Sequence, residues 1–237
     1  MSRALVLAGH GSHLDPNSSR PVHAHAARIR EMGVFDEVAA VFWKEEPPFS
    51  RLLDVVEADE VTVVPVFMAE GFFTDRVLPR EMGLDGPVTR RGGRTIRYTA
   101  PIGTHPRIAG VAAARADEAG AGAGHLVAVI GHGTPRHPGS AATTEEVAAA
   151  LRRRGTYRDA MAVFLDQEPA IATLAGQAPP VVAVPLFVAD GWHAGVQVPG
   201  IAGEAVPDGL VYTAAIGLHP LISDLILELA SGVETCR

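Results

Sequence analysis

The sequence has 237 residues, of which 47% are hydrophobic and 20% charged, with a formal net charge of −7. This composition is typical of a globular protein, and the length allows one large domain or two of ordinary size. The acidic balance disfavours nucleic-acid binding, no apolar run approaches the roughly 18 residues of a membrane span, and a single cysteine, Cys236, excludes an internal disulfide. We expect a cytoplasmic protein that binds neither nucleic acid nor a membrane.

The first half of the sequence alternates short apolar runs with helical patterns. Runs rich in β-branched residues that end in turn residues predict strands. These strands are expected at 4–9, 38–42, 61–67 and 96–99. Apolar residues at helical spacing predict helices at 20–33, about 49–58, near 75–82 and in the alanine-rich stretch after Pro106. The arginine-rich run at 90–94 is interpreted as a connection.

The second half repeats this order after a glycine-rich linker at 120–124. Its predicted strands are 126–130, 160–165, 181–187 and 210–213. Its predicted helices are about 143–153, a short one after Pro169 and a final one after Pro220. This alternation is typical of right-handed βαβ crossovers and parallel sheets. We predict an α/β fold of two tandem flavodoxin-like units, each a four-stranded parallel sheet with flanking helices, facing across a central cleft. The units are expected at 1–122 and 123–237.

Polar motifs recur between the halves in the same order. Two pairs recur at an offset of 122 residues, namely His10 with His132 and Glu46 with Glu168. Gly71 recurs as Gly191 at an offset of 120, and His105 recurs as His219 at an offset of 114. Offsets that drift by a few residues in loops, while the order is kept, indicate duplicated structural units. Every motif follows a predicted strand, and ligands of parallel sheets bind beyond the carboxyl ends of the strands. The repeat therefore indicates a functional site.

Two histidines of the second half are candidates for that site. His132 lies in a Gly-His-Gly-Thr turn directly after a strand, and His193 follows the third strand of its half. Strands one and three are neighbours in a flavodoxin-like sheet, so the two imidazoles can converge. Such a pair can hold a divalent metal or accept a proton. A bond to a neighbouring carbonyl is the simpler interpretation of His132 alone, but the recurrence at His10 favours a site.

The halves differ where the second histidine stands. Phe73 occupies the first-half position that corresponds to His193, so the first half cannot repeat the pair. Glu70 stands opposite an aspartate of the second half. We therefore predict one site, with His132 and His193 from the second half and Glu70, together with His10, from the first. An exposed loop carboxylate is the alternative interpretation of Glu70.

Other residues and missing motifs limit the choice of chemistry. His105 and His219 precede prolines, so we expect turn or capping roles for them. The sequence has no G-x-x-x-x-G-K-[ST], no G-x-G-x-x-G after its first strand and no G-x-S-x-G, which disfavours nucleotide-driven, dehydrogenase and serine hydrolase mechanisms. A hydrolase or isomerase that uses His10 or His132 as a base is a weaker candidate, because it lacks a nucleophile motif.

Three motifs together resemble a known family. They are strand–Gly-His-Gly-[Ser/Thr], strand–Pro-hydrophobic-Phe-x-x-[Glu/Asp]-Gly, followed in the second half by Trp-His, and Ile-Gly-x-His-Pro. These motifs resemble the sirohydrochlorin chelatases of CbiX type, which are ATP-independent class II tetrapyrrole chelatases, and the resemblance covers nearly the whole chain. It implies two flavodoxin-like units and insertion of cobalt(II), or iron(II), into sirohydrochlorin on the route to cobalamin or siroheme.

The resemblance also implies roles for the candidate residues. In related two-half enzymes two second-half histidines and a first-half glutamate hold the metal, which corresponds to His132, His193 and Glu70 here. Half-length members use the histidines after strands one and three, a pattern that Phe73 breaks in the first half. His10 is then expected to accept a proton or position the macrocycle rather than bind the ion.

Partners follow from the same resemblance. The expected ligand is sirohydrochlorin or a similar carboxylate-rich tetrapyrrole, and cobalt(II), iron(II) or nickel(II) is a substrate rather than a resident cofactor. Cations must border the cleft, and the candidates are Arg136, Arg20, Arg76, Arg80 and Lys44. Because both halves lie in one chain, a monomer can supply the whole site. The alternative function is a two-lobed carrier that binds a divalent ion without catalysis.

Overall fold

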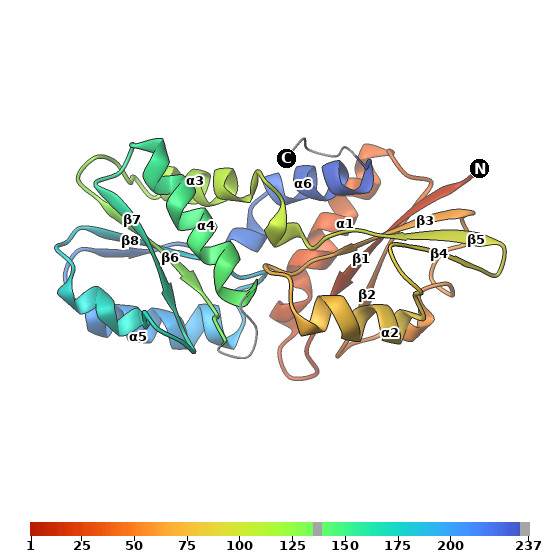
Figure 1. The fold of residues 1–237 in the computed structure, drawn as a ribbon, viewed down its shortest axis with the longest axis horizontal. Coiled ribbons are helices and arrows are strands. Elements are labelled where there is room, and N and C mark those ends of the chain that lie inside the picture. The colour runs from red at the N-terminus through yellow and green to blue at the C-terminus, as the bar shows by residue number, and fades with distance from the viewer. Residues whose placement is uncertain (135–138, 233–237) are drawn as a thin grey trace. The chain divides into compact units, whose positions relative to one another are not determined.

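The computed structural model describes residues 1–134 and 139–232, which form two compact units (Figure 1). Unit 1 comprises Met1–His105 and the chain from Pro220 onward, and unit 2 comprises Pro106–His219. Each unit is a sheet covered by helices on both faces, which confirms the predicted α/β fold. No helix in the described ranges is long and apolar enough to cross a membrane.

The sheet of unit 1 has five strands in the order β2-β1-β3-β5-β4. Their bounds are β1 Arg3–Gly9, β2 Glu37–Phe42, β3 Glu60–Pro65, β4 Val88–Arg91 and β5 Arg94–Tyr98. The first four in this order are parallel, and the central strand β1 pairs with β2 on one side and β3 on the other. Strands one and three are therefore neighbours, as predicted.

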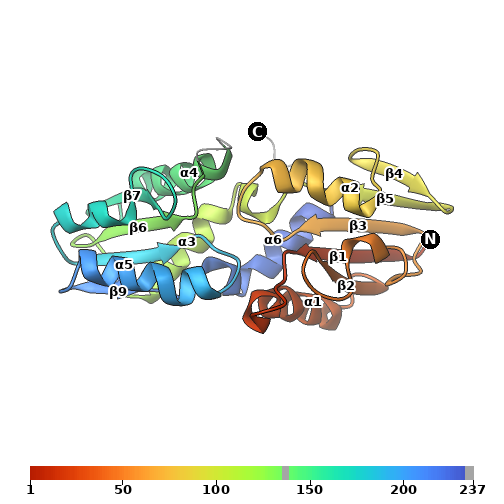
Figure 2. The same cartoon turned by 90° about the horizontal axis from the view of Figure 1, so that it is seen from below.

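The fifth strand of unit 1 corrects the prediction of a four-stranded sheet in this half. Strand β4 lies antiparallel to β5 at the edge of the sheet, where we expected only a connection (Figure 2). Gly92 and Gly93 have φ angles of 59° and 79°, and two successive residues with positive φ form the tight turn that matches the twist of a hairpin. The arginine-rich run is thus a β-hairpin because its two central residues are glycines.

Unit 2 has the four parallel strands that were predicted, in the order β7-β6-β8-β9. Their bounds are β6 Leu126–Gly131, β7 Asp159–Phe164, β8 Val181–Pro185 and β9 Leu210–Tyr212. The order matches that of the first four strands of unit 1, so both units have the flavodoxin-like arrangement with the first strand at the switch point. The carboxyl ends of β7, β6 and β8 thus lie side by side.

Within residues 1–134 and 139–232, six α-helices flank the two sheets. They are α1 Arg20–Met32, α2 Leu78–Met82, α3 Ile108–Glu118, α4 Gly139–Arg154, α5 Val198–Ala205 and α6 Leu221–Ala230. In unit 1, α1 and α6 pack together against one face of the sheet, while α2 covers the other (Figure 1). In unit 2, α3 and α4 share one face and α5 lies on the other.

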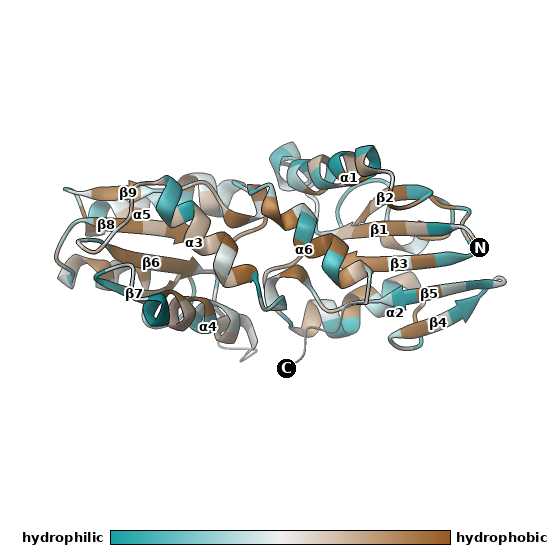
Figure 3. Ribbon diagram, turned by 90° about the horizontal axis from the view of Figure 1, so that it is seen from above, coloured by the Kyte–Doolittle hydropathy of each residue, from teal (hydrophilic) through white to brown (hydrophobic). Residues whose placement is uncertain are grey.

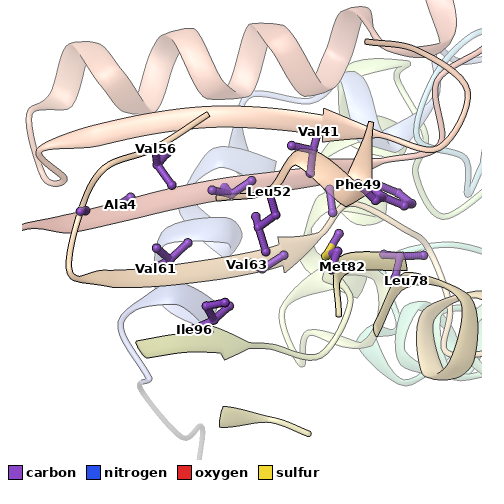
Figure 4. Packing of buried hydrophobic residues seen from close by; sticks show 13 residues of the cluster. Ala4, Val41, Phe49, Leu52, Val56, Val61, Val63, Leu78, Met82 and Ile96 are labelled. Carbon is purple, nitrogen blue, oxygen red and sulfur yellow. The ribbon is translucent and has the colours of Figure 1, made fainter. Parts of the chain in front are cut away.

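The inner strands β1, β6 and β8 are apolar and buried along nearly their whole length, as expected for sheets with helices on either side, whereas the hairpin strands β4 and β5 are more polar (Figure 3). In unit 1 the side chains of Leu52, Val63 and Met82 belong to one buried cluster together with Ala4 of β1 (Figure 4). The unit 2 core of Ala128, Ile130 and their neighbours packs against α5. Burial of these side chains, at about 25 cal/mol per Å² of apolar surface, is the main term that stabilises each unit.

The helix predicted at 49–58 is wrong. Only a 3-10 turn, Phe49–Arg51, forms there. The Arg94 guanidinium donates hydrogen bonds to the carbonyl oxygens of Leu53 and Val56, at 2.8 and 2.6 Å, so these groups find a partner outside a helical ladder. The corresponding short helix of the second half is likewise a 3-10 helix, Ile171–Gly176.

The last helix of each sequence half belongs to the unit built on the other half's sheet. Helix α3 packs within unit 2 and α6 within unit 1, so the compact units do not share the bounds 1–122 and 123–237 expected for the halves. A buried histidine adjoins each exchanged helix. His105 lies 3.3 Å from Glu228 of α6, and His219 lies 3.1 Å from Glu118 of α3.

Candidate metal centre

His132 stands at the carboxyl end of β6, on the first turn after the strand. Gly133 has a φ of 69°, a conformation that glycine adopts without strain, and this turn leaves the imidazole of His132 exposed. Its Nδ1 atom lies 3.0 Å from the carbonyl oxygen of Gly133 and 3.3 Å from Oδ2 of Asp166. With two acceptors beside it, Nδ1 carries the proton, and Nε2 keeps its lone pair for a ligand.

His193 begins a π-helical turn, His193–Gln197, that follows β8. Single π-turns often occur at functional sites, because they place side chains where a regular helix would not. In this turn Nδ1 of His193 lies 2.7 Å from Oε1 of Gln197, which orients the ring and leaves Nε2 available. The second imidazole is therefore oriented in the same way as the first.

Tyr212 fastens this π-turn to the sheet. Its hydroxyl donates a hydrogen bond of 2.7 Å to the carbonyl oxygen of Ala194. Burial, and secondarily the charge of Asp190, raise the pKa of the Tyr212 phenol, so the group remains a donor at all ordinary pH values. Unit 1 has the same arrangement, since the hydroxyl of Tyr98 donates to the carbonyl oxygen of Thr74 at 2.8 Å.

The imidazoles of His132 and His193 lie together, as predicted. Their ring centres are 5.3 Å apart and their planes form an angle of 72°. Two imidazoles that bind one tetrahedral ion at about 2.1 Å per bond place their ring centres about 5 Å apart. The pair is thus spaced for one shared divalent ion, and its exposure lets a ligand approach.

Asp166 was not predicted as a site residue. It follows β7, and because its carboxylate lies beside Nδ1 of His132 it orients the imidazole in the manner of a carboxylate–histidine–metal triad. Among residues 1–134 and 139–232 no group of three or more His, Cys, Asp or Glu side chains is placed to hold a metal ion. The signal that could have found Asp166 is a comparison of the two halves, in which Lys44 stands at the equivalent position.

Glu70 lies in unit 1, in the loop between β3 and the π-turn Phe73–Val77, and is exposed. In the part of the chain that the structure describes, its carboxylate makes no hydrogen bond or ion pair. Its counterpart in unit 2, Asp190, instead accepts a hydrogen bond of 2.9 Å from the amide of Ala215. Asp190 therefore holds its loop, whereas the Glu70 carboxylate stays accessible to a proton or an ion, and its role as a ligand stays a prediction.

His10 occupies the position in unit 1 that His132 occupies in unit 2. Its Nδ1 lies 2.8 Å from the carbonyl oxygen of Gly11, and its ring centre lies 5.6 Å from that of Phe73. An aromatic ring thus stands where the second imidazole would be. His10 is exposed and its Nε2 is available. Because it has an aromatic ring rather than a second imidazole beside it, it suits proton transfer better than metal binding.

The remaining candidates lie elsewhere. His105 and His219 are buried at the ends of 3-10 turns, where the turn role was expected. Desolvation alone would raise the pKa of Glu118, but a hydrogen bond and the charge of His219, together with Arg115, hold this pKa below its usual range. The cations Arg20, Arg76 and Lys44 are exposed in unit 1, and Arg80 pairs with Glu81. Arg136 and Cys236 lie outside the described residues.

Replacing Gln197 by leucine is expected to weaken cobalt(II) binding by about 10- to 100-fold, because loss of a partner that orients a ligating histidine has costs of this size. Isothermal titration with cobalt(II) measures the change. Gln197→Glu is the matched control, since it keeps an acceptor beside Nδ1 of His193 and should retain the affinity. Equal affinities of the leucine and glutamate variants would contradict the orienting role.

Comparison of the sequence with known proteins shows which family the chain belongs to. The sequence model of the CbiX family matches the chain twice, at residues 4–119 and 126–232. The chain is 39% identical to a Halobacterium salinarum protein named probable sirohydrochlorin cobaltochelatase, over 97% of this chain and 91% of that protein. It is 33% identical to a sirohydrochlorin cobaltochelatase of Methanopyrus kandleri, over 49% of this chain and 96% of the relative.

Solved structures agree in fold. A multi-domain Deinococcus radiodurans protein, described as structurally similar to chelatases, superposes with a TM-score of 0.85 at 34% identity, over 97% of this chain. This chain spans 55% of that protein. The cobalt complex of the sirohydrochlorin chelatase SirB from Bacillus subtilis superposes with a TM-score of 0.76 at 16% identity, over 98% of this chain and 94% of SirB. The chain belongs to the CbiX family.

Proposed function

We propose that this protein inserts a divalent metal, cobalt(II) or iron(II), into sirohydrochlorin without ATP. The observation that carries the proposal is the pair of exposed imidazoles, 5.3 Å apart at neighbouring strand ends of unit 2, each with Nδ1 engaged and Nε2 available. Relatives named sirohydrochlorin cobaltochelatase support the choice of substrate.

In this proposal His132 and His193 take the hydrated ion from solution. Imidazole nitrogen suits cobalt(II) and iron(II), and two neutral ligands hold an ion less tightly than a closed site of charged groups would. Such a site can therefore release the ion to a better ligand, the four nitrogens of the ring.

Metal insertion also has to remove two protons. The metal-free macrocycle carries two pyrrole N–H groups, so each insertion exchanges one divalent ion for two protons and leaves the net charge unchanged. The imidazole of His10 and the carboxylate of Glu70 are exposed bases in unit 1 and are proposed to accept these protons. No ATP is needed in this scheme, because formation of four metal–nitrogen bonds supplies the driving force.

The test is to incubate the purified protein with sirohydrochlorin and cobalt(II) and to follow the change in ring absorbance. We expect a rate well above that of the protein-free mixture and proportional to protein concentration. A rate equal to the spontaneous one, with cobalt(II) still bound to the protein, would favour the alternative function, a two-lobed metal carrier.

A further inference from the structure

The loop that carries His10 in unit 1 has the same backbone as the loop that carries His132 in unit 2. In both loops Nδ1 lies close to the carbonyl oxygen of the following glycine, at 2.8 and 3.0 Å. The amide of Lys44 donates to the carbonyl oxygen of His10, and the amide of Asp166 donates to that of His132, both at 2.9 Å. Lys44 and Asp166 therefore occupy equivalent places beside equivalent histidines.

The side chains on these two frames differ in a consistent way. Relative to unit 2, unit 1 has Lys44 for Asp166, Phe73 for His193 and Val77 for Gln197. Each of the three changes removes a ligand or a group that orients a ligand. The lysine change also reverses the local charge, and an ammonium group repels a divalent ion. Unit 1 therefore keeps the backbone of the metal-binding loop but lacks the side chains that bind and orient at the metal.

Two of these replacements, Phe73 and Lys44, adjoin an aromatic cluster that packs against the core of unit 1 and is partly exposed. The ring centre of Phe73 lies 5.7 Å from that of Trp43 and 5.4 Å from that of Phe67. Nζ of Lys44 lies 5.4 Å from the Trp43 ring. The neighbouring Phe72 is 67% exposed, which is unusual for so large an apolar side chain.

Lys44 is itself distinctive. It is the only lysine in the sequence, which otherwise uses arginine for its cations. The side chain is exposed, and within the described ranges no carboxylate forms an ion pair with it. An unpaired ammonium at the edge of an aromatic surface is complementary to a flat apolar ring that carries carboxylates at its rim.

We propose that the Lys44 patch, formed by His10, Trp43, Lys44, Phe72 and Phe73, binds the tetrapyrrole substrate, with the Lys44 ammonium paired to one of its carboxylate side chains. The inference rests on the proposed function and assigns a different ligand to each unit. The His132 loop of unit 2 binds the metal, and the equivalent His10 loop of unit 1 binds the tetrapyrrole ring.

The test measures binding of metal-free sirohydrochlorin by titration of its absorbance, in the absence of any metal. Exposed ion pairs contribute modestly, so Lys44→Gln is expected to weaken binding about threefold, and the charge reversal Lys44→Asp about tenfold or more. Lys44→Arg keeps the charge and should bind within about twofold of the unchanged protein. Arg28→Gln, which removes an exposed cation from the later turns of α1, controls for net charge and should bind normally.

Amine acetylation gives an independent readout, because Lys44 supplies the only side-chain amine. Metal-free sirohydrochlorin should slow acetylation of Lys44 but not of the N-terminal amine. Cobalt(II) titration of Lys44→Asp should show unchanged affinity at the histidine pair. Normal ring binding by Lys44→Asp would overturn the proposal that the Lys44 patch binds the ring, and so would an equal loss of ring affinity in Arg28→Gln. Neither result would contradict the proposed metal insertion. Failure of the unchanged protein to bind the ring would instead overturn the proposed function.

Discussion

Replacing His193 by alanine is expected to abolish cobalt(II) insertion while the chain stays folded. The side chain is exposed at the start of a π-turn, so its removal leaves no cavity in the core. Loss of an outer partner alone costs about 10- to 100-fold in affinity, so loss of the ligand itself should lower the insertion rate on the order of a thousandfold. His132→Ala is expected to behave in the same way, since a single imidazole cannot hold the ion.

The measurement is the initial rate of the absorbance change at fixed sirohydrochlorin and cobalt(II), with circular dichroism to verify folding. His23→Ala is a suitable control, because His23 lies exposed on α1 and contacts the buried ring of Phe42 rather than the candidate site. Near-full activity of a folded His193→Ala or His132→Ala protein would show that the pair does not present the metal.

Replacing Gly217 by alanine is expected to destabilise unit 2 severely. A Cβ atom at this position would lie 2.2 Å from the carbonyl oxygen of Val188, and the amide of Gly217 is held by a 3.0 Å hydrogen bond to Phe187. Backbone on both sides would have to move, so we expect a loss of about 3 kcal/mol or more in the free energy of unfolding. The displaced loop leads to His193, so insertion should slow as well.

Urea unfolding measures this loss. Gly200→Ala, in α5 of the same unit, is the matched control, because a Cβ there meets nothing within 4 Å. Relief of the glycine penalty in a helix should make that variant about 0.5–1 kcal/mol more stable. If Gly217→Ala unfolded at the same urea concentration as the unchanged protein, the close approach to Val188 would not be a constraint. Gly103 has the same contact with Met68 in unit 1.

Much of the fold could be predicted because the inner strands of each sheet are apolar runs buried on both faces. Every predicted strand is present, and the repeat fixed which strands correspond. The missed strand β4 has a local signal, the Gly92-Gly93 pair of its hairpin, but the missing helix depends on contacts distant in sequence. The helix expected at 49–58 does not form where Arg94, about forty residues further on, bonds its carbonyl groups. The exchange of α3 and α6 between the units has no local signal, because it depends on what each helix packs against.

The candidate site, like the fold, was predicted only in part. His132 and His193 were predicted because glycines and strand ends mark them, and the structure brings them together. Asp166 and Gln197 were missed because each acts through a histidine, and a single carboxylate or amide in a loop has no signature of its own. Comparison of the halves could have found both, since Lys44 and Val77 stand in their places.

The most direct test of the account is a crystal structure of the protein soaked with cobalt(II), with the metal located by its anomalous scattering. We expect one ion in unit 2, bonded to Nε2 of both His132 and His193 at about 2.1 Å, and none at His10. Cobalt(II) bound beside His10, or bound in unit 2 without both imidazoles, would contradict the assignment of the metal to this histidine pair.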